Sequence, residues 1–167
     1  MVLIKKDLKN AKIKNVKHLS NTLKILDISY NCGIYQNGFN NCLLIKNLNV
    51  SGNKKIKNVN HLKNTLKILN ISFNCGVDQK GFNECLLIEN LIVMNNSKII
   101  NINHLKNILK ILDISGEDCG INQKGFEECL LIENLTIISN SKIININHLK
   151  DTLKMINFIN LKDEVNS

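Results

Sequence analysis

One short motif returns along almost the whole chain at a nearly fixed interval. The pair His-Leu occurs at residues 18–19, 61–62, 104–105 and 148–149, so successive copies are 43 or 44 residues apart. A repeated segment of this length cannot bury its apolar face alone and must stack on its neighbours. The repeat therefore predicts a solenoid, with residues 1–167 forming a single domain.

Each long interval divides into two shorter units when its apolar residues are aligned. The first unit reads L-x-x-L-x-I-x-x-N from Leu23, and the second reads I-x-x-L-x-V-x-x-N from Ile45. In both, alternate apolar residues send their side chains to one face of a short strand. The units begin at Leu23, Ile45, Leu66, Ile88, Leu109, Ile132 and Leu153.

This pattern resembles the leucine-rich repeat over roughly residues 10–160. Units of the Ile45 kind are similar to the short phosphatase-regulator type, and units of the Leu23 kind are similar to the cysteine-containing type. The resemblance implies an α/β fold, a right-handed solenoid with a parallel β-sheet on its concave face and short helices or turns on its convex face. We expect an irregular N-terminal repeat or cap over 1–20, regular repeats over 21–152 and a partial repeat over 153–167.

Asparagine recurs just after each expected strand, where a buried amide can both donate to and accept from the backbone of the turn. We expect these amides to form a structural ladder inside the solenoid. In the third long copy Glu117-Asp118 lengthens the turn by one residue, and we expect a bulge or a break in the ladder there. The ladder residues are Asn31, Asn53, Asn74, Asn96 and Asn140.

The side chains between the core positions of each strand should cover the concave face. They vary more between copies than the core residues do, and they are mostly neutral and moderately apolar, as in surfaces that bind a protein or peptide. The candidate partner-binding residues are Ile25, Asp27, Tyr30, Ile68, Asn70, Phe73, Ile92, Met94 and Asp113.

Positive charge is concentrated in the first third of the chain. Residues 1–60 contain eleven lysines and two aspartates, whereas the remainder is close to neutral. Aligning the repeats predicts a basic edge, and an alternative function follows from it: docking of nucleic acid or another anionic surface. The absence of arginine and the scarcity of aromatic residues argue against nucleic acid as the partner. The basic edge comprises Lys12, Lys14, Lys54, Lys55 and Lys57.

Six cysteines occupy two repeat positions, and four histidines occupy a third. Equivalent residues should lie two layers apart, about 10 Å, which exceeds the roughly 7 Å between Cα atoms that a disulfide allows. It is also too far for a shared zinc ion. A pairing of Cys32 with Cys42 within one unit stays open. We expect packing thiols, no metal, no cofactor and no catalytic residue; a hydrolase using a Cys/His pair is the least favoured alternative.

The composition, with abundant Lys, Asn and Ile and no Arg or Pro, resembles that of proteins from AT-rich genomes, such as giant DNA viruses or protists. We see no apolar run that could span a bilayer and expect a cytoplasmic protein without membrane contact, in the host cytoplasm if viral. The expected function is a non-catalytic interaction module or scaffold that binds an unknown protein or peptide, a host protein in the viral case. We also expect a homodimer that buries one end, or terminal segments that fold back as caps.

Overall fold

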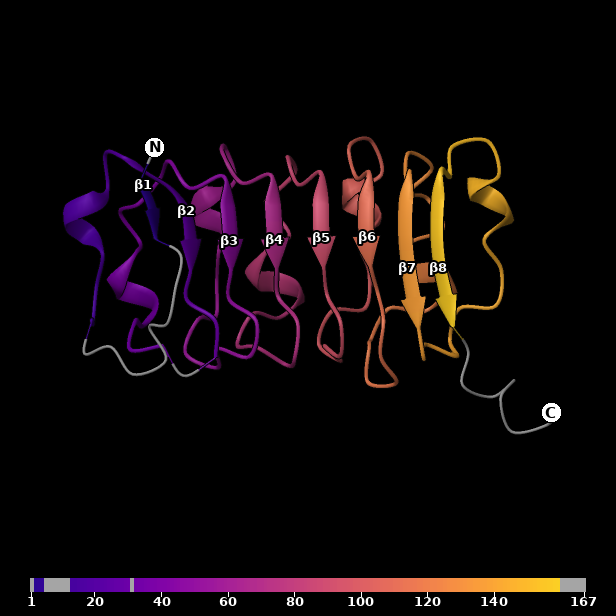
Figure 1. Ribbon diagram of the computed structural model, residues 1–167, viewed down its shortest axis with the longest axis horizontal. Helices are drawn as coiled ribbons and strands as arrows, with labels where there is room; N and C mark the ends of the chain where they lie inside the picture. The colour runs from indigo at the N-terminus through magenta and orange to yellow at the C-terminus, as the bar shows by residue number, and fades with distance from the viewer. Residues whose placement is uncertain (1, 5–12, 31, 160–167) are drawn as a thin grey trace.

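The computed structural model describes residues 2–4, 13–30 and 32–159. It contains one sheet of eight strands that follow one another in the order of the chain. Neighbouring strands are parallel throughout, and they lie side by side from β1 to β8 in Figure 1. The arrangement confirms an α/β repeat solenoid. The strands are β1 (Val2–Ile4), β2 (Leu23–Asp27), β3 (Asn47–Asn49), β4 (Ile68–Asn70), β5 (Asn90–Ile92), β6 (Ile111–Asp113), β7 (Asn134–Ile138) and β8 (Met155–Ile159).

The pairing register is constant from β2 to β8, because each strand places its central leucine or isoleucine opposite the equivalent residue of the next. Leu26 pairs with Leu48, Leu48 with Leu69, and so on to Ile156. β1 precedes the first strand expected from the repeat pattern and pairs with β2. The sheet therefore begins before residue 20, in the segment expected to be an irregular repeat or cap.

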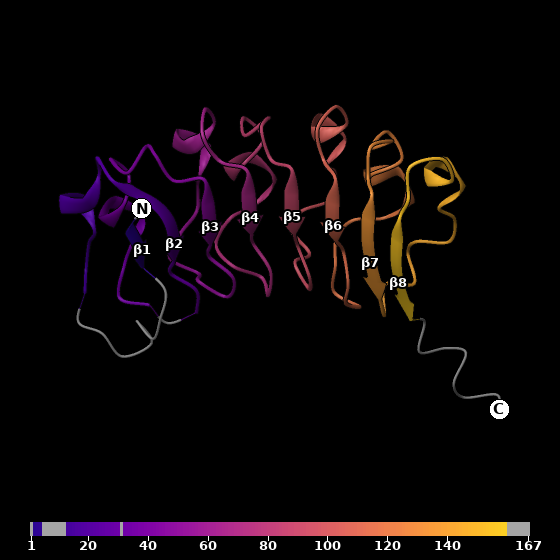
Figure 2. The same ribbon diagram turned by 45° about the horizontal axis from the view of Figure 1, so that its top comes forward.

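Short 3₁₀ turns lie in the connections between successive strands, on the side of the solenoid away from the sheet; several are seen above and behind the strands in Figure 2. They are the only helical segments in the described ranges, since 21 to 23 residues per unit leave little chain for a longer helix. Four contain the repeated His-Leu pair: η1 (Lys17–Leu19), η3 (Asn60–Leu62), η5 (Asn103–Leu105) and η7 (Asn147–Leu149). Three end at a glycine: η2 (Gln36–Gly38), η4 (Gln79–Gly81) and η6 (Gln123–Gly125).

The terminal glycines of η2, η4 and η6 let adjacent layers approach closely. A Cβ atom added to Gly81 would lie 2.3 Å from the carbonyl oxygen of Lys57, and one added to Gly125 would lie 2.3 Å from that of Ile100. The phenylalanine that follows each glycine is completely buried in the core, at Phe39, Phe82 and Phe126. The Gly-Phe pair thus joins a close backbone contact to a large core side chain.

A column of buried asparagines, one in every second unit, links each of these units to the unit before it. The side-chain amides of Asn53, Asn96 and Asn140 donate to the carbonyl oxygens of residues 28, 71 and 114 at 2.6, 2.6 and 2.8 Å. Their Oδ1 atoms accept from the backbone N–H two residues further on, at 3.0 to 3.2 Å. Each amide therefore hydrogen-bonds to the backbone both of the preceding unit and of its own turn.

Asn74 departs from the expected ladder. It is only half-buried, its backbone has φ 46°, and its Oδ1 accepts from the N–H and the hydroxyl of Ser97. In the turn after β4, Phe73 and Asn74 both adopt left-handed backbone, which displaces the inward-pointing position by one residue. Cys75 is therefore the buried residue of this turn.

The other units of the same kind also bury a cysteine in the turn after the strand. Cys32 and Cys119 are buried at the position of Cys75, while Asn31 lies outside the described residues. In the third copy, Gly116, Glu117 and Asp118 take up the additional residue before Cys119. Of the two expected outcomes, a bulge or a break in the ladder, the structure shows the first: the extra residue is accommodated in the exposed turn and Cys119 stays buried.

Candidate binding surfaces

The side chains of the sheet that point away from the core form a continuous surface, here called the sheet face. The first residues of the central strand triplets make one row, in which isoleucine and asparagine alternate: Ile25, Asn47, Ile68, Asn90, Ile111 and Asn134. The third residues make a second row: Asp27, Asn49, Asn70, Ile92, Asp113 and Thr136. The structure thus places the strand residues proposed for partner binding on one face.

Four polar residues of the second row also stabilise the ends of their strands. The Oδ1 atoms of Asp27, Asn49, Asn70 and Asp113 each accept the backbone N–H of the serine two residues later, at 2.9 to 3.1 Å. Asn49 additionally donates to the second oxygen of Asp27 at 2.9 Å. The repeated Asp/Asn-x-Ser pattern is therefore accounted for by local structure, so Asp27, Asn70 and Asp113 are weaker candidates for partner recognition.

A column of left-handed residues follows the strands. Their φ angles are 53°, 65°, 56°, 49°, 99° and 58° at Tyr30, Gly52, Phe73, Asn95, Gly116 and Ser139. Each donates its N–H to a carbonyl of the next layer at 2.7 to 2.9 Å, which continues the hydrogen bonding of the sheet into the turns. Glycine and asparagine adopt this conformation readily, whereas bulky side chains rarely do. Tyr30 and Phe73 are therefore the exceptions in the column.

The rings of Tyr30 and Phe73 stack across the intervening layer, and we call them the aromatic pair. Their centroids are 6.1 Å apart with an interplanar angle of 27°. Gly52 lies between them in the column, and a Cβ atom there would be 2.8 Å from Cδ1 of Tyr30. Both side chains remain about two-fifths exposed, at 43% and 42%. The pair is thus a partly exposed apolar platform beside the C-terminal ends of strands β2 to β4.

A hollow of about 580 Å³ begins at Phe73 and continues along the same edge. Met94 and Ile138 contribute apolar surface to it, and Glu117 and Asp118 contribute exposed carboxylates. Both acidic side chains come from the lengthened turn of the third copy. The hollow therefore combines apolar lining with negative charge beside the aromatic pair.

The basic edge is divided by the structure. Lys14, Lys54 and Lys57 are exposed, whereas Lys55 is half-buried: its ammonium donates to the carbonyl oxygen of Cys32 at 3.3 Å and lies 4.5 Å from the ring centroid of Tyr35. The equivalent Lys98 and Lys142 also donate to cysteine carbonyls, of Cys75 and Cys119. Lysine at this position therefore links adjacent turns. The remaining residue of the basic edge, Lys12, lies outside the described residues.

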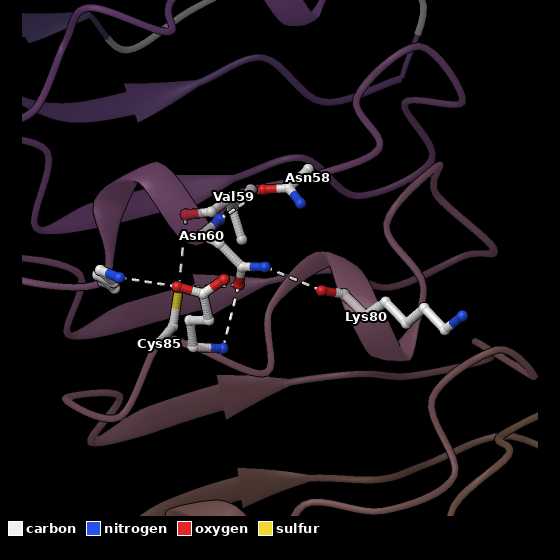
Figure 3. Close-up of polar contacts among 7 residues, drawn as sticks. Asn58, Val59, Asn60, Lys80 and Cys85 are labelled. Atoms are coloured by element: carbon white, nitrogen blue, oxygen red, sulfur yellow. Dashed lines mark hydrogen bonds and ion pairs between the residues drawn. The ribbon is translucent and has the colours of Figure 1, made fainter.

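A polar network on the turn side was not anticipated from the sequence. Figure 3 shows Asn60 joining two layers: its amide donates to the carbonyl oxygen of Lys80 at 2.9 Å and accepts from the N–H of Glu84 at 3.2 Å. Its own N–H donates to Asn58, and the thiol of Cys85 donates to the carbonyl of Val59 at 3.5 Å.

The same network recurs one long repeat later. Asn103 bonds to Lys124 and Glu128 at 3.0 and 3.2 Å. Gln36, Gln79 and Gln123 each bridge to the unit that follows, at residues 57–58, 100–101 and 144–145. In the sequence, this network could have been recognised from the recurrence of Asn-x-Asn-His-Leu and of glutamine at fixed positions. These amides satisfy exposed and half-buried backbone, a structural role.

Exposed leucine pairs form another repeated feature that the sequence reasoning missed. Leu43-Leu44, Leu86-Leu87 and Leu130-Leu131 follow the buried cysteines of the turn side and are all exposed. Two equivalent hollows of about 530 and 500 Å³ lie beside the second and third pairs. The repeated motif Cys-Leu-Leu-Ile was the sequence signal for these pairs. Its cysteine and isoleucine are buried, and the two leucines between them are exposed.

All six cysteines are free and buried. Burial raises the pKa of the Cys75 and Cys119 thiols to about 11 and that of the Cys85 and Cys129 thiols to about 12. A thiol attacks as its thiolate, so these groups are poor nucleophiles near neutral pH. Within the described ranges, no three His, Cys, Asp or Glu side chains come together to hold a metal ion.

Three of the repeated histidines pack edge-on against core phenylalanines. The ring pairs are Phe39 with His61, Phe82 with His104, and Phe126 with His148, and their centroids are 4.9 to 5.0 Å apart. Burial lowers the pKa of each imidazole below its ordinary value of 6.5. The histidine column therefore contributes to the packing between layers.

Comparison with protein families found no family model that matches the chain. Comparison with curated proteins gave no match either. Among the residues that the structure describes, no helix has the length and apolar character needed to cross a membrane.

Proposed function

We propose that this chain is a non-catalytic interaction module of the leucine-rich-repeat type, which binds a protein or peptide at the sheet face and its adjoining turn edge. The aromatic pair is the centre of the proposed site. The hollow that continues from Phe73 would receive the neighbouring residues of the partner.

The backbone of Tyr30 and Phe73 is the observation that carries this proposal. Left-handed backbone costs a residue with a Cβ atom roughly 1–2 kcal/mol, and the same column accepts Gly52, Asn95 and Gly116. The fold alone would be served better by glycine or asparagine at both positions. Strained and partly exposed aromatic side chains are common at sites that contact a ligand.

The chemistry of the hollow favours a particular kind of partner. Apolar lining from Met94 and Ile138 suits an aliphatic or aromatic side chain, and Glu117 and Asp118 suit a lysine or arginine next to it. We therefore propose a partner segment in which an apolar anchor is followed closely by a basic residue.

A displayed peptide library selected on the immobilised full chain tests the proposal. We expect enriched peptides to share an apolar residue adjacent to Lys or Arg, and we expect Phe73→Asn to weaken their binding at least tenfold. Asparagine suits the backbone at this position, as Asn95 demonstrates with φ 49°. The variant should therefore fold normally, which circular dichroism can check.

Ile100→Asn is the matched control, since it also removes an exposed apolar side chain but lies on the turn side. It should leave peptide binding unchanged. Equal losses in the two variants, or binding unaffected by Phe73→Asn, would contradict the proposed site. Binding that instead falls steeply with salt and is lost in a Lys54→Glu and Lys57→Glu double variant would favour the anionic-surface alternative.

A further inference from the structure

The last strand, β8, leaves the C-terminal end of the solenoid core open in the described part of the chain. Ile156 and Phe158 lie opposite Leu135 and Ile137 and so continue the buried columns of the core. Leu135 and Ile137 are each only 1% exposed, whereas Ile156 and Phe158 are 43% and 47% exposed. A hollow of about 270 Å³ separates these two side chains from Ile143, Ile144 and Ile146.

Within the described part of the chain, the backbone of β8 pairs with a neighbouring strand on one side only, that of β7. Met155 donates its N–H to Glu133, and Ile159 accepts from the N–H of Ser139, so the odd-numbered residues of the strand face β7. Backbone groups alternate between the two sides of a strand. The N–H and C=O groups of Ile156 and Phe158 therefore point away from β7, toward the free edge.

The sequence of this strand, Met-Ile-Asn-Phe-Ile, is nearly symmetric about Asn157. If two copies pair antiparallel about a two-fold axis through Asn157, Ile156 of one copy lies opposite Phe158 of the other, and Met155 lies opposite Ile159. Residues directly opposite in an antiparallel pair have their side chains on the same face. The core residues of the two copies would thus meet one another, as would the residues of the two sheet faces.

This register also uses the free backbone groups. Ile156 and Phe158 would form hydrogen-bonded pairs, while the two Asn157 residues would form the non-hydrogen-bonded pair on the axis. Every outward N–H and C=O of Ile156 and Phe158 then has a partner. The strand is complementary to itself in side-chain type, in face and in backbone pairing.

We infer that β8 is the dimerisation strand of this protein and that its occupant is β8 of a second copy. The two sheets join edge to edge in a symmetric dimer, with their sheet faces on the same side. The aromatic pair, on the turns after β2 and β4, lies far along the sheet from this interface. Each dimer therefore presents two aromatic pairs to partners.

Light scattering on the purified full chain across a dilution series is the first measurement. We expect a mass twice the 18.9 kDa of one chain at high concentration and dissociation on dilution. Phe158→Lys should raise the dimer dissociation constant at least 100-fold. Ile100→Lys, which places the same charge at an exposed isoleucine away from this end, should leave it unchanged.

Cysteine substitutions test the register itself. Asn157→Cys places two thiols on the axis, within the roughly 7 Å between Cα atoms that a disulfide allows, and oxidation should give a covalent dimer in high yield. Met155→Cys should not crosslink, because its two copies would be about 14 Å apart. The unsubstituted chain, whose six cysteines are buried, controls for other disulfides.

Three outcomes would overturn the inference. One is a monomeric mass at every concentration. This would occur if residues 160–167 of the same chain covered β8, or if its edge stayed uncovered. Another is a dimer that survives Phe158→Lys. The third is a dimer in which Met155→Cys crosslinks and Asn157→Cys does not, since this would indicate another register.

Discussion

The rings of Tyr30 and Phe73 stack with their centroids 6.1 Å apart although a whole long repeat separates them in the chain. The contact requires Gly52 between them, because any side chain there would collide with the ring of Tyr30. It also requires left-handed backbone at all three positions. One repeat position thus supports either an unstrained turn or an exposed aromatic side chain, and the chain uses both.

Substitution of Gly52 should reveal how tightly this arrangement is held. Gly52→Ala places a Cβ atom 2.8 Å from Tyr30 and demands φ 65° of a residue with a side chain. We expect a loss of about 1–3 kcal/mol in the free energy of unfolding, measured by urea denaturation. Adding Tyr30→Ala should recover the part due to the collision and leave the part due to the backbone. Fully additive effects of the two substitutions would contradict this account.

Substitution of Asn96 should be far more damaging than substitution of Asn74. Asn96→Ala removes a buried amide that donates to Ile71 at 2.6 Å and accepts from Lys98 at 3.1 Å. The N–H of Lys98 then loses this partner, and the carbonyl of Ile71 keeps only the weak hydrogen bond from the Cys75 thiol. We expect a loss of about 1–3 kcal/mol in unfolding free energy. Asn74→Gly, which keeps left-handed backbone favourable, should cost less than about 1 kcal/mol. Similar costs at the two sites would disprove the alternating column of asparagine and cysteine.

Stability should decrease as the pH falls below 6.5. Burial lowers the pKa of His61, His104 and His148 in the folded state, so the unfolded chain binds more protons in this range. The stabilisation from the neutral imidazoles is therefore complete above 6.5 and is lost as the pH falls toward their folded pKa values. Melting temperatures between pH 8 and 5 will show this, and His104→Phe should flatten the profile. An unchanged slope in that variant would exclude His104 as a contributor.

The thiols should react slowly in the folded protein. All six are buried, and the pKa of four of them is raised to about 11 or 12. We expect a thiol reagent to titrate six groups after unfolding without prior reduction, and to modify the native chain at least 100-fold more slowly than an exposed Ser141→Cys thiol. Fewer than six reactive groups in the unfolded chain would reveal disulfides.

The same shifts predict an alkaline limit to stability. The folded state keeps its thiols protonated beyond their ordinary pKa of 9.0, whereas the unfolded chain releases those protons. Their stabilising contribution is therefore complete below pH 9 and is lost as the pH rises toward 11 or 12. Cys75→Ala and Cys85→Ala, each compared with the parent chain, should show a shallower decline of melting temperature above pH 9. A decline as steep in both variants as in the parent chain would assign it to other groups.

The period of the sequence determined the solenoid, because apolar side chains at fixed intervals can be buried only if equivalent strands stack in register. It also placed Asn53, Asn96 and Asn140 after their strands, at positions that prove to be buried. The residues of the sheet face followed from the alternation of side chains along each strand.

Only the tertiary structure decided which residue of each turn points inward. Asn74 fits the linear spacing of the repeat, yet left-handed backbone at Phe73 and Asn74 shifts the buried position to Cys75. Likewise, Asp27 and Asp113 lie on the sheet face as expected but accept hydrogen bonds from Ser29 and Ser115. Spacing specifies where a residue lies along the chain, whereas backbone angles and hydrogen-bond partners in neighbouring layers depend on the folded stack. The sequence alone therefore determined the architecture, and the packed layers decided which polar and aromatic side chains remain available to a partner.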